Sequence, residues 1–193
     1  MSLGLFNWHS SQNSRKISPK SETKAVSLHH KTKKPAKMSE VELILVRESD
    51  KCTMYTIQFL SEDKNEFQRF IAKFKDDATY NPDFVKIVNF ITQISERGAL
   101  ERYFRPEGKM KDGVCALPTI SSKLRLYCLR LSDSILVLGN GDVKDTKTYD
   151  ENDTLKGYVI NLQKFEELLK EGVKDGSVKI TKTTIETDKT FEL

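Results

Sequence analysis

The chain has 193 residues, of which 37% are hydrophobic and 31% charged, and its formal net charge is +4. A chain of this length can bury a core of ordinary size. It has no apolar run approaching about eighteen residues, which argues against a membrane-spanning helix, and its first residues lack the apolar core of a secretory signal. Three widely spaced cysteines, Cys52, Cys115 and Cys128, form no Cys-x-x-Cys pair, so we expect buried thiols in a reducing compartment.

The basic character of the chain belongs to its N-terminal segment. Residues 1–40 hold eight of the 32 Lys and Arg residues but only two of the 28 acids. This segment contains "HHKTKKPAK" and lacks periodic apolar residues, so it cannot bury enough surface to offset the entropy lost on ordering. We expect a disordered basic tail over 1–40 and a single domain over 41–193. The tail is either a solvated extension or a nucleic-acid arm.

Two strands and a helical hairpin are expected at the start of the domain. Residues 41–47 and 54–60 are rich in β-branched, aromatic and leucine residues, with a polar turn between them. Two helical stripes follow, in which apolar residues recur three and four positions apart. The stripes comprise Phe67, Phe70, Ile71 and Phe74, then Phe84, Ile87, Val88, Ile91 and Ile94. Asn81 is expected to cap the second helix, Pro82 to lie in its first turn, and Gly98 to end it.

Three short strands are expected next, as antiparallel neighbours, over residues 113–118, 123–131 and 134–140. Side chains alternate between two faces along the middle strand. The face expected to pack under the helices carries Leu124, Leu126 and Cys128. Arg125 and Tyr127 point to the opposite face, which we expect to be open to solvent.

A further helix is expected near the C-terminus. Asp153 can cap this helix, its apolar stripe extends over residues 155–169, and it is expected to end near Gly172. Residues 177–181 can form a last strand, and the residues after it are expected to fray. The fold class expected from these elements is α+β, with a curved antiparallel sheet packed by an N-terminal helical hairpin and an extra C-terminal helix.

The folded part of the chain lacks the residues that several kinds of catalysis need. The only histidines of the whole chain, His9, His29 and His30, lie in the expected tail. The folded part therefore has none, which argues against His-based zinc sites, Ser-His-Asp triads and His-dependent nucleases. No phosphate-binding loop of the Gly-x-x-x-x-Gly-Lys-Ser/Thr type occurs. The glycine-containing segment 139–142 is not followed at once by a helix. We therefore expect no metal and no organic cofactor.

Arginine, lysine and tyrosine residues remain as candidates for function. Residues 97–130 hold eight bases and three acids. Guanidinium groups bind phosphates through paired hydrogen bonds, and aromatic rings stack on single-stranded bases. Arginine and lysine also stabilise the charge that develops when a 2′-hydroxyl attacks the adjacent phosphate of RNA. The candidate site residues are Arg102, Arg105, Lys123, Arg125, Tyr127, Lys144 and Lys147, with ordinary solvated surface charges as the alternative.

The order of these elements, with the segments "YFRPEGKMKDGVCALP", "LRLYCLR" and "ILVLGNGDVKDTK", resembles the RelE/ParE superfamily of bacterial toxins, especially its HigB-like, phage-derived branch. The resemblance covers about residues 54–150. It implies a small α+β fold, a cytoplasmic location and ribosome-dependent, metal-free cleavage of mRNA. It also implies a type II toxin–antitoxin system, in which a cognate antitoxin protein inhibits the toxin, and no membrane partner.

The resemblance implies roles for individual residues. Arg125 matches the signature arginine of the middle strand and would bind the scissile phosphate. Lys144 and Lys147 match the lysines that follow the last long strand and would stabilise charge or transfer protons. Tyr127 would stack on a base or orient it. Arg102, Arg105 and Lys123 would bind RNA.

The sequence departs from the family pattern at two places. Ala116-Leu117-Pro118 stands where the family usually reads Glu-Leu-Arg, so one basic residue is missing. Gly141-Asp142-Val143 stands where an aromatic residue usually precedes the lysines, so an acid lies beside the expected site. These departures leave a second interpretation open, in which the chain is a phage-encoded, non-catalytic RelE-fold protein that only binds protein or RNA.

Overall fold

The computed structural model divides the chain into two units, residues 1–36 and 37–193. It describes residues 38–107, 113–118, 120, 122–146 and 148–193, all within the second unit. The expected disordered tail lies outside the described residues except for its last three positions, and Glu40 already belongs to the first strand.

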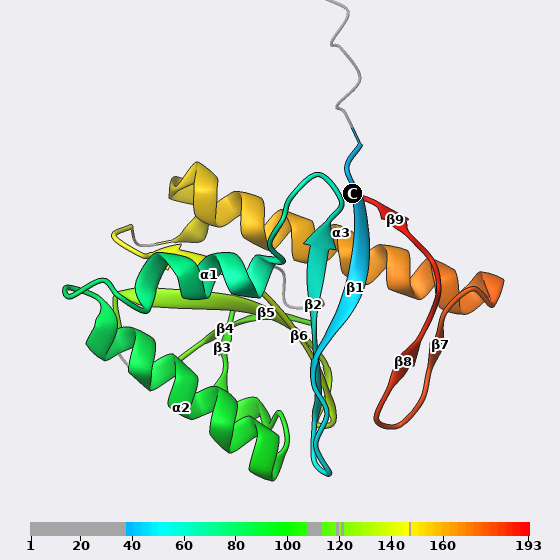
Figure 1. Ribbon diagram of the computed structural model, residues 1–193, viewed down its shortest axis with the longest axis horizontal. Helices are drawn as coiled ribbons and strands as arrows, with labels where there is room; N and C mark the ends of the chain where they lie inside the picture. Colours follow the sequence, from blue (N-terminus) through cyan, green and yellow to red (C-terminus); the bar gives the residue numbers. More distant parts are fainter. Residues whose placement is uncertain (1–37, 108–112, 119, 121, 147) are drawn as a thin grey trace, which may run out of the picture. The chain divides into compact units, whose positions relative to one another are not determined.

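Helices and strands occupy most of the described part of the chain (Figure 1). In chain order they are β1 (Glu40–Arg47), β2 (Thr53–Phe59), α1 (Glu66–Phe74), α2 (Asn81–Arg97), the short 3-10 helix η1 (Glu101–Tyr103), β3 (Arg105–Pro106), β4 (Val114–Leu117), β5 (Leu124–Ser132), β6 (Ile135–Val143), a second 3-10 helix η2 (Tyr149–Glu151), α3 (Asp153–Asp175), β7 (Lys179–Ile180), β8 (Ile185–Glu186) and β9 (Phe191–Glu192).

The main sheet has seven strands in the order β3-β4-β5-β6-β2-β1-β9. Strands β2 and β6 are parallel, whereas the other neighbours are antiparallel. The parallel pair arises because the chain leaves β2 through α1 and α2, crosses to β4, and returns through β5 to the side of β2. The predicted fold class is therefore wrong: the sheet is mixed, and the helical hairpin follows two strands instead of standing at the N-terminus.

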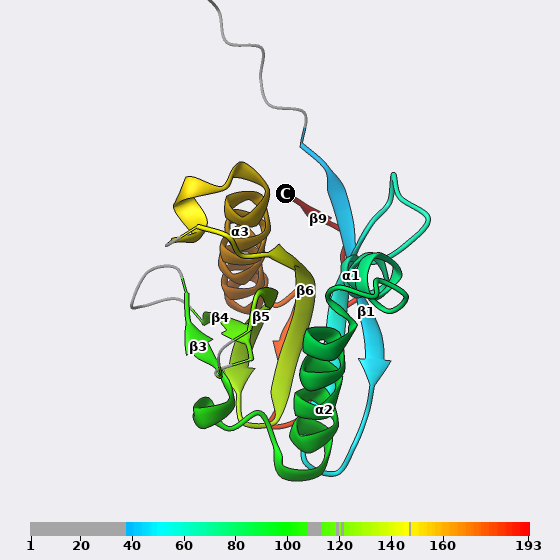
Figure 2. The same cartoon turned by 90° about the vertical axis from the view of Figure 1, so that its left-hand side faces the viewer.

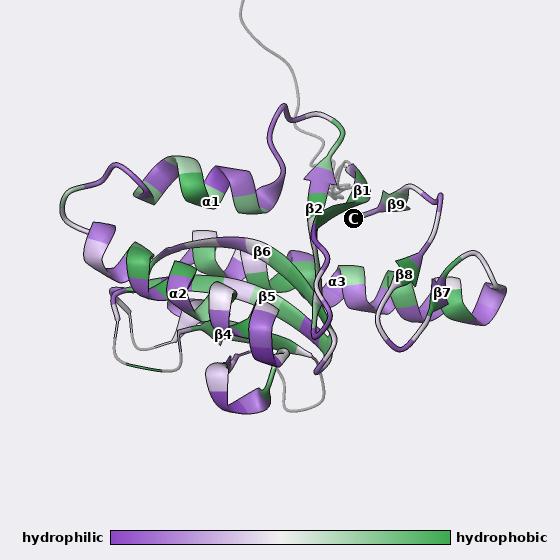
Figure 3. Ribbon diagram, turned by 60° about the horizontal axis from the view of Figure 1, so that its bottom comes forward, coloured by the Kyte–Doolittle hydropathy of each residue, from purple (hydrophilic) through white to green (hydrophobic). Residues whose placement is uncertain are grey.

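The sheet of this unit lies between α3 on one face and the α1–α2 pair on the other (Figure 2). The prediction that one face of β5 packs under the first two helices is confirmed, because Leu124, Leu126 and Cys128 share a core with residues of α1 and α2. The opposite face is not open, as predicted, because α3 covers it. In Figure 3 the central strands β5 and β6 are largely hydrophobic, as expected for strands covered on both faces.

The first two helices begin and end at local sequence signals. Asn65 caps α1: its side chain accepts a hydrogen bond from the backbone N–H of Gln68 (2.8 Å), and the Gln68 side chain accepts one from the Asn65 N–H (3.2 Å). The predicted Pro82 and Gly98 signals of α2 are confirmed, since the proline lies in the first turn and Gly98 ends the helix at φ 92°. Asn81 is not the cap, because it is already helical.

The C-terminal part is more ordered than the sequence predicts. Asn152, not Asp153, caps α3 by accepting hydrogen bonds from the backbone N–H groups of residues 154 and 155. The helix continues past Gly172 to Asp175. The predicted frayed end instead forms β8 and β9, and β9 pairs with the start of β1. Phe191 of β9 is buried against Phe165 of α3, with ring centroids 5.1 Å apart.

Candidate functional site

Arg125 and Tyr127 lie on the same face of β5, as predicted, but they are buried. The exposed fraction is 5% for Arg125 and 0% for Tyr127. The expectation of an open face is wrong because the C-terminal helix, predicted as an addition to the fold, packs against this face and shares a core with Tyr127. The two residues are therefore enclosed in the described part of the chain, and more accessible charged groups lie on neighbouring segments.

Arg125 is held at the start of β5 by two carbonyl groups. Its Nη1 donates to the carbonyl oxygens of Ser122 (2.6 Å) and Leu124 (2.8 Å). Burial and the nearby Arg105 lower the pKa of Arg125, but a guanidinium keeps its charge in proteins. Its Nε has no hydrogen-bond partner within the described residues. One end of the guanidinium is thus fixed, and a donor remains for another group.

Glu107 lies where the predicted basic residues meet. Lys144 Nζ is 3.4 Å from Glu107 Oε1, and Arg105 Nε is 3.8 Å from the same oxygen. The carboxylate also acts electrostatically on Arg125 and Tyr127. We call this group the Glu107 cluster; it comprises Arg105, Glu107, Arg125, Tyr127 and Lys144. Sequence reasoning missed Glu107, although an acid between two bases in "RPEGK" was the signal that could have found it.

Accessibility differs strongly within the Glu107 cluster. The side chains of Glu107 and Lys144 are only 7% and 9% exposed, whereas that of Arg105 is 52% exposed. Buried charges interact more strongly than exposed ones because less solvent screens them. The cluster carries three cations and one anion, so it keeps a net positive charge that Arg105 presents to solvent.

The sheet register explains how the cluster assembles. Arg105 of β3 is paired with Ala116 of β4, which is paired with Tyr127 of β5. Lys144 follows the end of β6, where its backbone N–H donates to the Lys123 carbonyl (2.7 Å). The β4–β5 pairing ends at Leu117 and Leu126, so Pro118 lies just beyond the ladder and adds no cation beside Arg125. Arg105, one strand further out, supplies a guanidinium near Arg125 instead.

Tyr127 carries a buried hydroxyl without a hydrogen-bond partner in the described part of the chain. Burial raises the pKa of this phenol, and the Glu107 carboxylate raises it further. The hydroxyl therefore stays protonated at neutral pH and can donate a hydrogen bond. Buried hydroxyl groups are nearly always paired in native structures, so this hydroxyl, beside Arg125 and Glu107, is a donor that the described residues leave unused.

The other predicted residues do not join the Glu107 cluster. Arg102 stacks on the neighbouring Tyr103 ring, with its guanidinium carbon 5.1 Å from the ring centroid. Lys123 is exposed, and its backbone N–H donates to Asp83 Oδ2 (2.8 Å). Lys147 lies outside the described residues. The structure thus brings together four of the seven predicted site residues.

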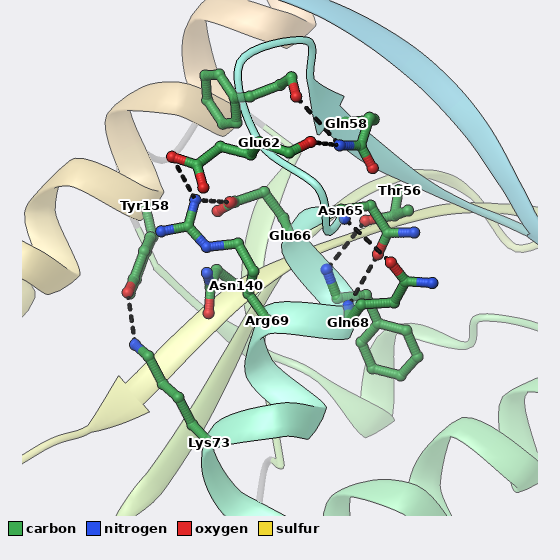
Figure 4. A network of polar contacts seen from close by, with 12 residues as sticks. Thr56, Gln58, Glu62, Asn65, Glu66, Gln68, Arg69, Lys73, Asn140 and Tyr158 are labelled. Atoms are coloured by element: carbon green, nitrogen blue, oxygen red, sulfur yellow. Dashed lines mark hydrogen bonds and ion pairs between the residues drawn. The ribbon is translucent and has the colours of Figure 1, made fainter.

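Asp142, the acid expected beside the site, forms an ion pair with Lys73 of α1. Asp142 is the cross-strand partner of Arg125, but its Oδ2 accepts a hydrogen bond from Lys73 Nζ (2.9 Å). Lys73 also donates to the Tyr158 hydroxyl of α3 (2.9 Å), a contact visible in Figure 4. Burial lowers the pKa of Lys73, yet these two hydrogen bonds outweigh it and raise the pKa overall. The charge of Asp142 is therefore balanced by Lys73.

A buried carboxylate next to this contact stabilises α1 against the sheet. Glu66 is almost fully buried and accepts a hydrogen bond from Arg69 (3.1 Å) (Figure 4). Burial raises its pKa, while Arg69 and the nearby Asn140 amide lower it. Because Arg69 covers this carboxylate, the group serves to pack α1 and is not an open site.

The prediction that the cysteines are buried is confirmed for all three. Burial raises the pKa of Cys52 to about 11 and raises that of Cys128 further above its ordinary value. Thiols in this state are poor nucleophiles at neutral pH. Among the described residues, no group of three His, Cys, Asp or Glu side chains is placed to hold a metal ion.

Comparison with known proteins gives no relative for this chain. No family model matches it, and no curated protein and no solved structure is significantly similar to it. None of the helices in the described part of the chain combines the length and the apolar composition needed to cross a membrane.

Proposed function

We propose that this protein binds single-stranded RNA at the Glu107 cluster and cleaves it without a metal, as a toxin of the RelE/ParE type acting on mRNA at the ribosome. The observation that carries the proposal is the convergence of Arg105 and Lys144 on Glu107, whose charge also acts on Arg125 and on Tyr127 with its unpaired hydroxyl. A phosphate group needs several directed donors and positive charge, and this cluster offers both.

Cleavage would proceed by attack of an RNA 2′-hydroxyl on the adjacent phosphate. The 2′-hydroxyl gives its proton to solvent as its oxygen bonds to phosphorus. The bond from phosphorus to the 5′-oxygen of the next nucleotide breaks as that oxygen takes a proton from Lys144, leaving a 2′,3′-cyclic phosphate and a 5′-hydroxyl. Arg125 and Arg105 would bind the non-bridging oxygens, where negative charge grows in the transition state. Lys144 would stabilise that charge or transfer a proton. The Tyr127 hydroxyl, held protonated by burial, would donate a hydrogen bond to a phosphate oxygen or orient a base.

The order of elements lends support to this assignment. The strand, helical hairpin and three strands on which the resemblance rests are present as β2, α1, α2, β4, β5 and β6. With the toxin assignment come two further proposals, a cytoplasmic location and a cognate antitoxin protein as partner.

A second candidate function is RNA or protein binding without cleavage. Two observations favour it: Ala116-Leu117-Pro118 removes a basic residue from β4, and Arg125 is almost fully buried with both contacts of its Nη1 already made. A binding protein needs only the exposed Arg105 and the net charge of the cluster.

Induced expression in bacteria tests the proposal. We expect growth to slow and new mRNA 5′ ends to appear inside translated reading frames, and Arg125→Ala to abolish both effects. Removal of one donor to a transition-state oxyanion typically lowers the rate about 10²–10³-fold. Lys123→Ala is the matched control, because it removes a positive charge two residues away that lies outside the cluster.

Two results would contradict cleavage. The first is harmless expression with intact mRNA, which favours the binding function. The second is undiminished mRNA cleavage by a folded Arg125→Ala variant, which places the site elsewhere. Circular dichroism checks folding, because Arg125 is buried and its loss leaves a cavity.

A further inference from the structure

The Glu107 carboxylate occupies the point at which the positive charges of the site converge. Lys144 and Arg105 both approach its Oε1, and its charge acts on Arg125 and Tyr127 as well. A carboxylate and a phosphate group attract the same donors. An RNA phosphate bound by these three cations would therefore compete with Glu107 for the same position.

The contacts that hold Glu107 in place are long. Its two ion pairs measure 3.4 Å and 3.8 Å, whereas Lys73–Asp142 and Lys170–Glu166 measure 2.9 Å and 2.7 Å. The Glu107 backbone N–H donates to the Val114 carbonyl at 3.4 Å, also a long distance. Charge-assisted hydrogen bonds are normally about 2.7–2.9 Å long. Within the described residues, displacing Glu107 thus breaks only weak contacts.

The strand that directly precedes Glu107 is also short. Strand β3 has two residues, Arg105 and Pro106, both exposed, and it is the edge of the sheet. A segment paired over two residues can shift without disturbing the core, because few backbone hydrogen bonds and little apolar surface hold it.

Glu107 leaves part of the donor set unused. Arg125 Nε and the Tyr127 hydroxyl have no hydrogen-bond partner in the part of the chain that the structure describes. Both residues are at least 95% buried, so an unmade hydrogen bond there is unfavourable. The phosphodiester of RNA carries the same single negative charge as a carboxylate, but its four oxygens stand in a tetrahedral arrangement around phosphorus, so it can use donors that Glu107 does not.

We propose that Glu107 is an internal anion that occupies the phosphate subsite in the free protein and is displaced when an RNA phosphate binds. This inference rests on the proposed function, since it names how the same site is kept closed. In the free state Glu107 neutralises part of the cationic cluster and limits binding of the wrong anions. A polyanionic strand overcomes this competition because several phosphates bind together.

Calorimetric titration of the full chain with inorganic phosphate at low ionic strength tests the inference. We expect Glu107→Gln to bind phosphate at least about fivefold more tightly than the natural chain. A negative charge about 4 Å from the bound phosphate weakens its binding by roughly 1 kcal/mol even in a solvent of high dielectric constant, and this variant removes that charge. Glu101→Gln is the matched control: it removes the same charge from the exposed helix η1, and its affinity should stay within about twofold. Adding Arg105→Ala to Glu107→Gln should cancel the gain.

Equal or weaker phosphate binding by folded Glu107→Gln would overturn the inference, because Glu107 would then serve to orient the cations. Glu107→Ala provides a second variant if the glutamine variant does not fold, with the same expected gain. Absence of phosphate binding by every folded variant would also overturn it. A gain in affinity without mRNA cleavage by the natural chain would leave the inference standing and reject the toxin function, whereas cleavage without that gain would reject the inference alone.

Discussion

Arg125 and Tyr127 combine near-complete burial with unused hydrogen-bonding capacity. A polar side chain with a purely structural role is normally either hydrogen-bonded or exposed to water, because an unpaired buried donor destabilises the protein by about 1–3 kcal/mol. Both donors lie beside Glu107, whose carboxylate acts electrostatically on both residues. At the scale of single residues, the Glu107 cluster thus contains groups that reduce stability, and the proposed RNA binding would supply the partners that they lack.

Tyr127→Phe should separate stability from activity. Removal of the unpaired hydroxyl is expected to raise the free energy of unfolding by about 1 kcal/mol and to lower RNA cleavage by about 10²-fold. Denaturant unfolding and a cleavage assay measure the two effects. Tyr55→Phe is the matched control with the opposite pattern, because the Tyr55 hydroxyl accepts a hydrogen bond from the Ile185 N–H (2.9 Å): it should lose stability and keep activity. A less stable Tyr127→Phe variant would contradict a binding role.

The lowered pKa of Asp83 predicts that the protein loses stability at acid pH. Its hydrogen bond to Lys86, and secondarily the Lys123 N–H, hold the pKa of Asp83 at about 2, below its ordinary value of 3.8. A carboxyl whose pKa is lowered by folding stabilises the protein above its ordinary pKa, and this stabilisation is lost as the pH falls from about 4 to about 2.

Asp83→Asn should therefore reduce stability at pH 7 by about 1 kcal/mol, less than the full pKa difference implies, because Lys86 is largely exposed. The difference from the natural chain should vanish near pH 2. Asp76→Asn, at an exposed position with one long ion pair, serves as the control and should change little at any pH. Urea unfolding between pH 2 and pH 7 gives the comparison, and a difference that persists at pH 2 would reject this role.

At the scale of elements, the β5–β6 pair sets the geometry of the site. The two strands carry or directly precede Arg125, Tyr127 and Lys144, and their register is irregular between Leu126 and Cys128. Gly141 of β6 lies opposite Leu126, and a Cβ added to it would lie 1.9 Å from the Arg125 carbonyl oxygen. Only glycine therefore permits this close approach, which fixes the backbone at Arg125.

Gly141→Ala should destabilise the protein by at least about 2 kcal/mol, because the strands must separate at Arg125. Gly157→Ala in α3 is the matched control: no atom lies within 4 Å of the added methyl group, and alanine favours the helix by about 1 kcal/mol. Thermal unfolding should show opposite shifts for the two variants. Unchanged stability of Gly141→Ala would mean that β6 can move away from β5 at this position without destabilising the protein.

Local patterns in the sequence were sufficient to predict most elements. Alternation along 123–131 correctly placed Arg125 and Tyr127 on one face, and the apolar stripe after residue 153 correctly predicted α3. Neither pattern says which surfaces meet, so the burial of Tyr127 in the core that it shares with α3 could not be predicted. Arg105 and Glu107 come close to Arg125 only because β3 pairs with β4. This pairing brings together residues that are distant along the chain, so no local pattern predicts it.

At the scale of the described unit, the unpredicted features are contacts between distant segments. The parallel pairing of β2 with β6 joins residues about 80 positions apart, and β9 joins the end of the chain to β1. Such pairings carry no local sequence signal, because short strands such as β9 contain too few residues to show alternation. The assumption of an antiparallel sheet came from the three successive strands 113–140, where it is correct.

Two shortened chains test where the folded unit begins. The low apolar content of residues 1–37 predicts that a chain starting at Met38 unfolds within about 4 °C of the full chain, a difference of about 1 kcal/mol for a domain of this size. A chain starting at Leu43 loses the fully buried Val41 and both backbone hydrogen bonds between Ser39 and Leu193.

The chain starting at Leu43 should unfold at least about 8 °C lower, because burial of one valine and the β1–β9 pairing together contribute more than about 2 kcal/mol. Phe191 then loses its strand partner, so its packing against Phe165 should loosen and the near-ultraviolet dichroism of the aromatic rings should weaken. A large fall in the midpoint already for the chain starting at Met38 would show that residues 1–37 contribute to the fold. Equal midpoints for the two shortened chains would show that β9 does not stabilise the edge of the sheet.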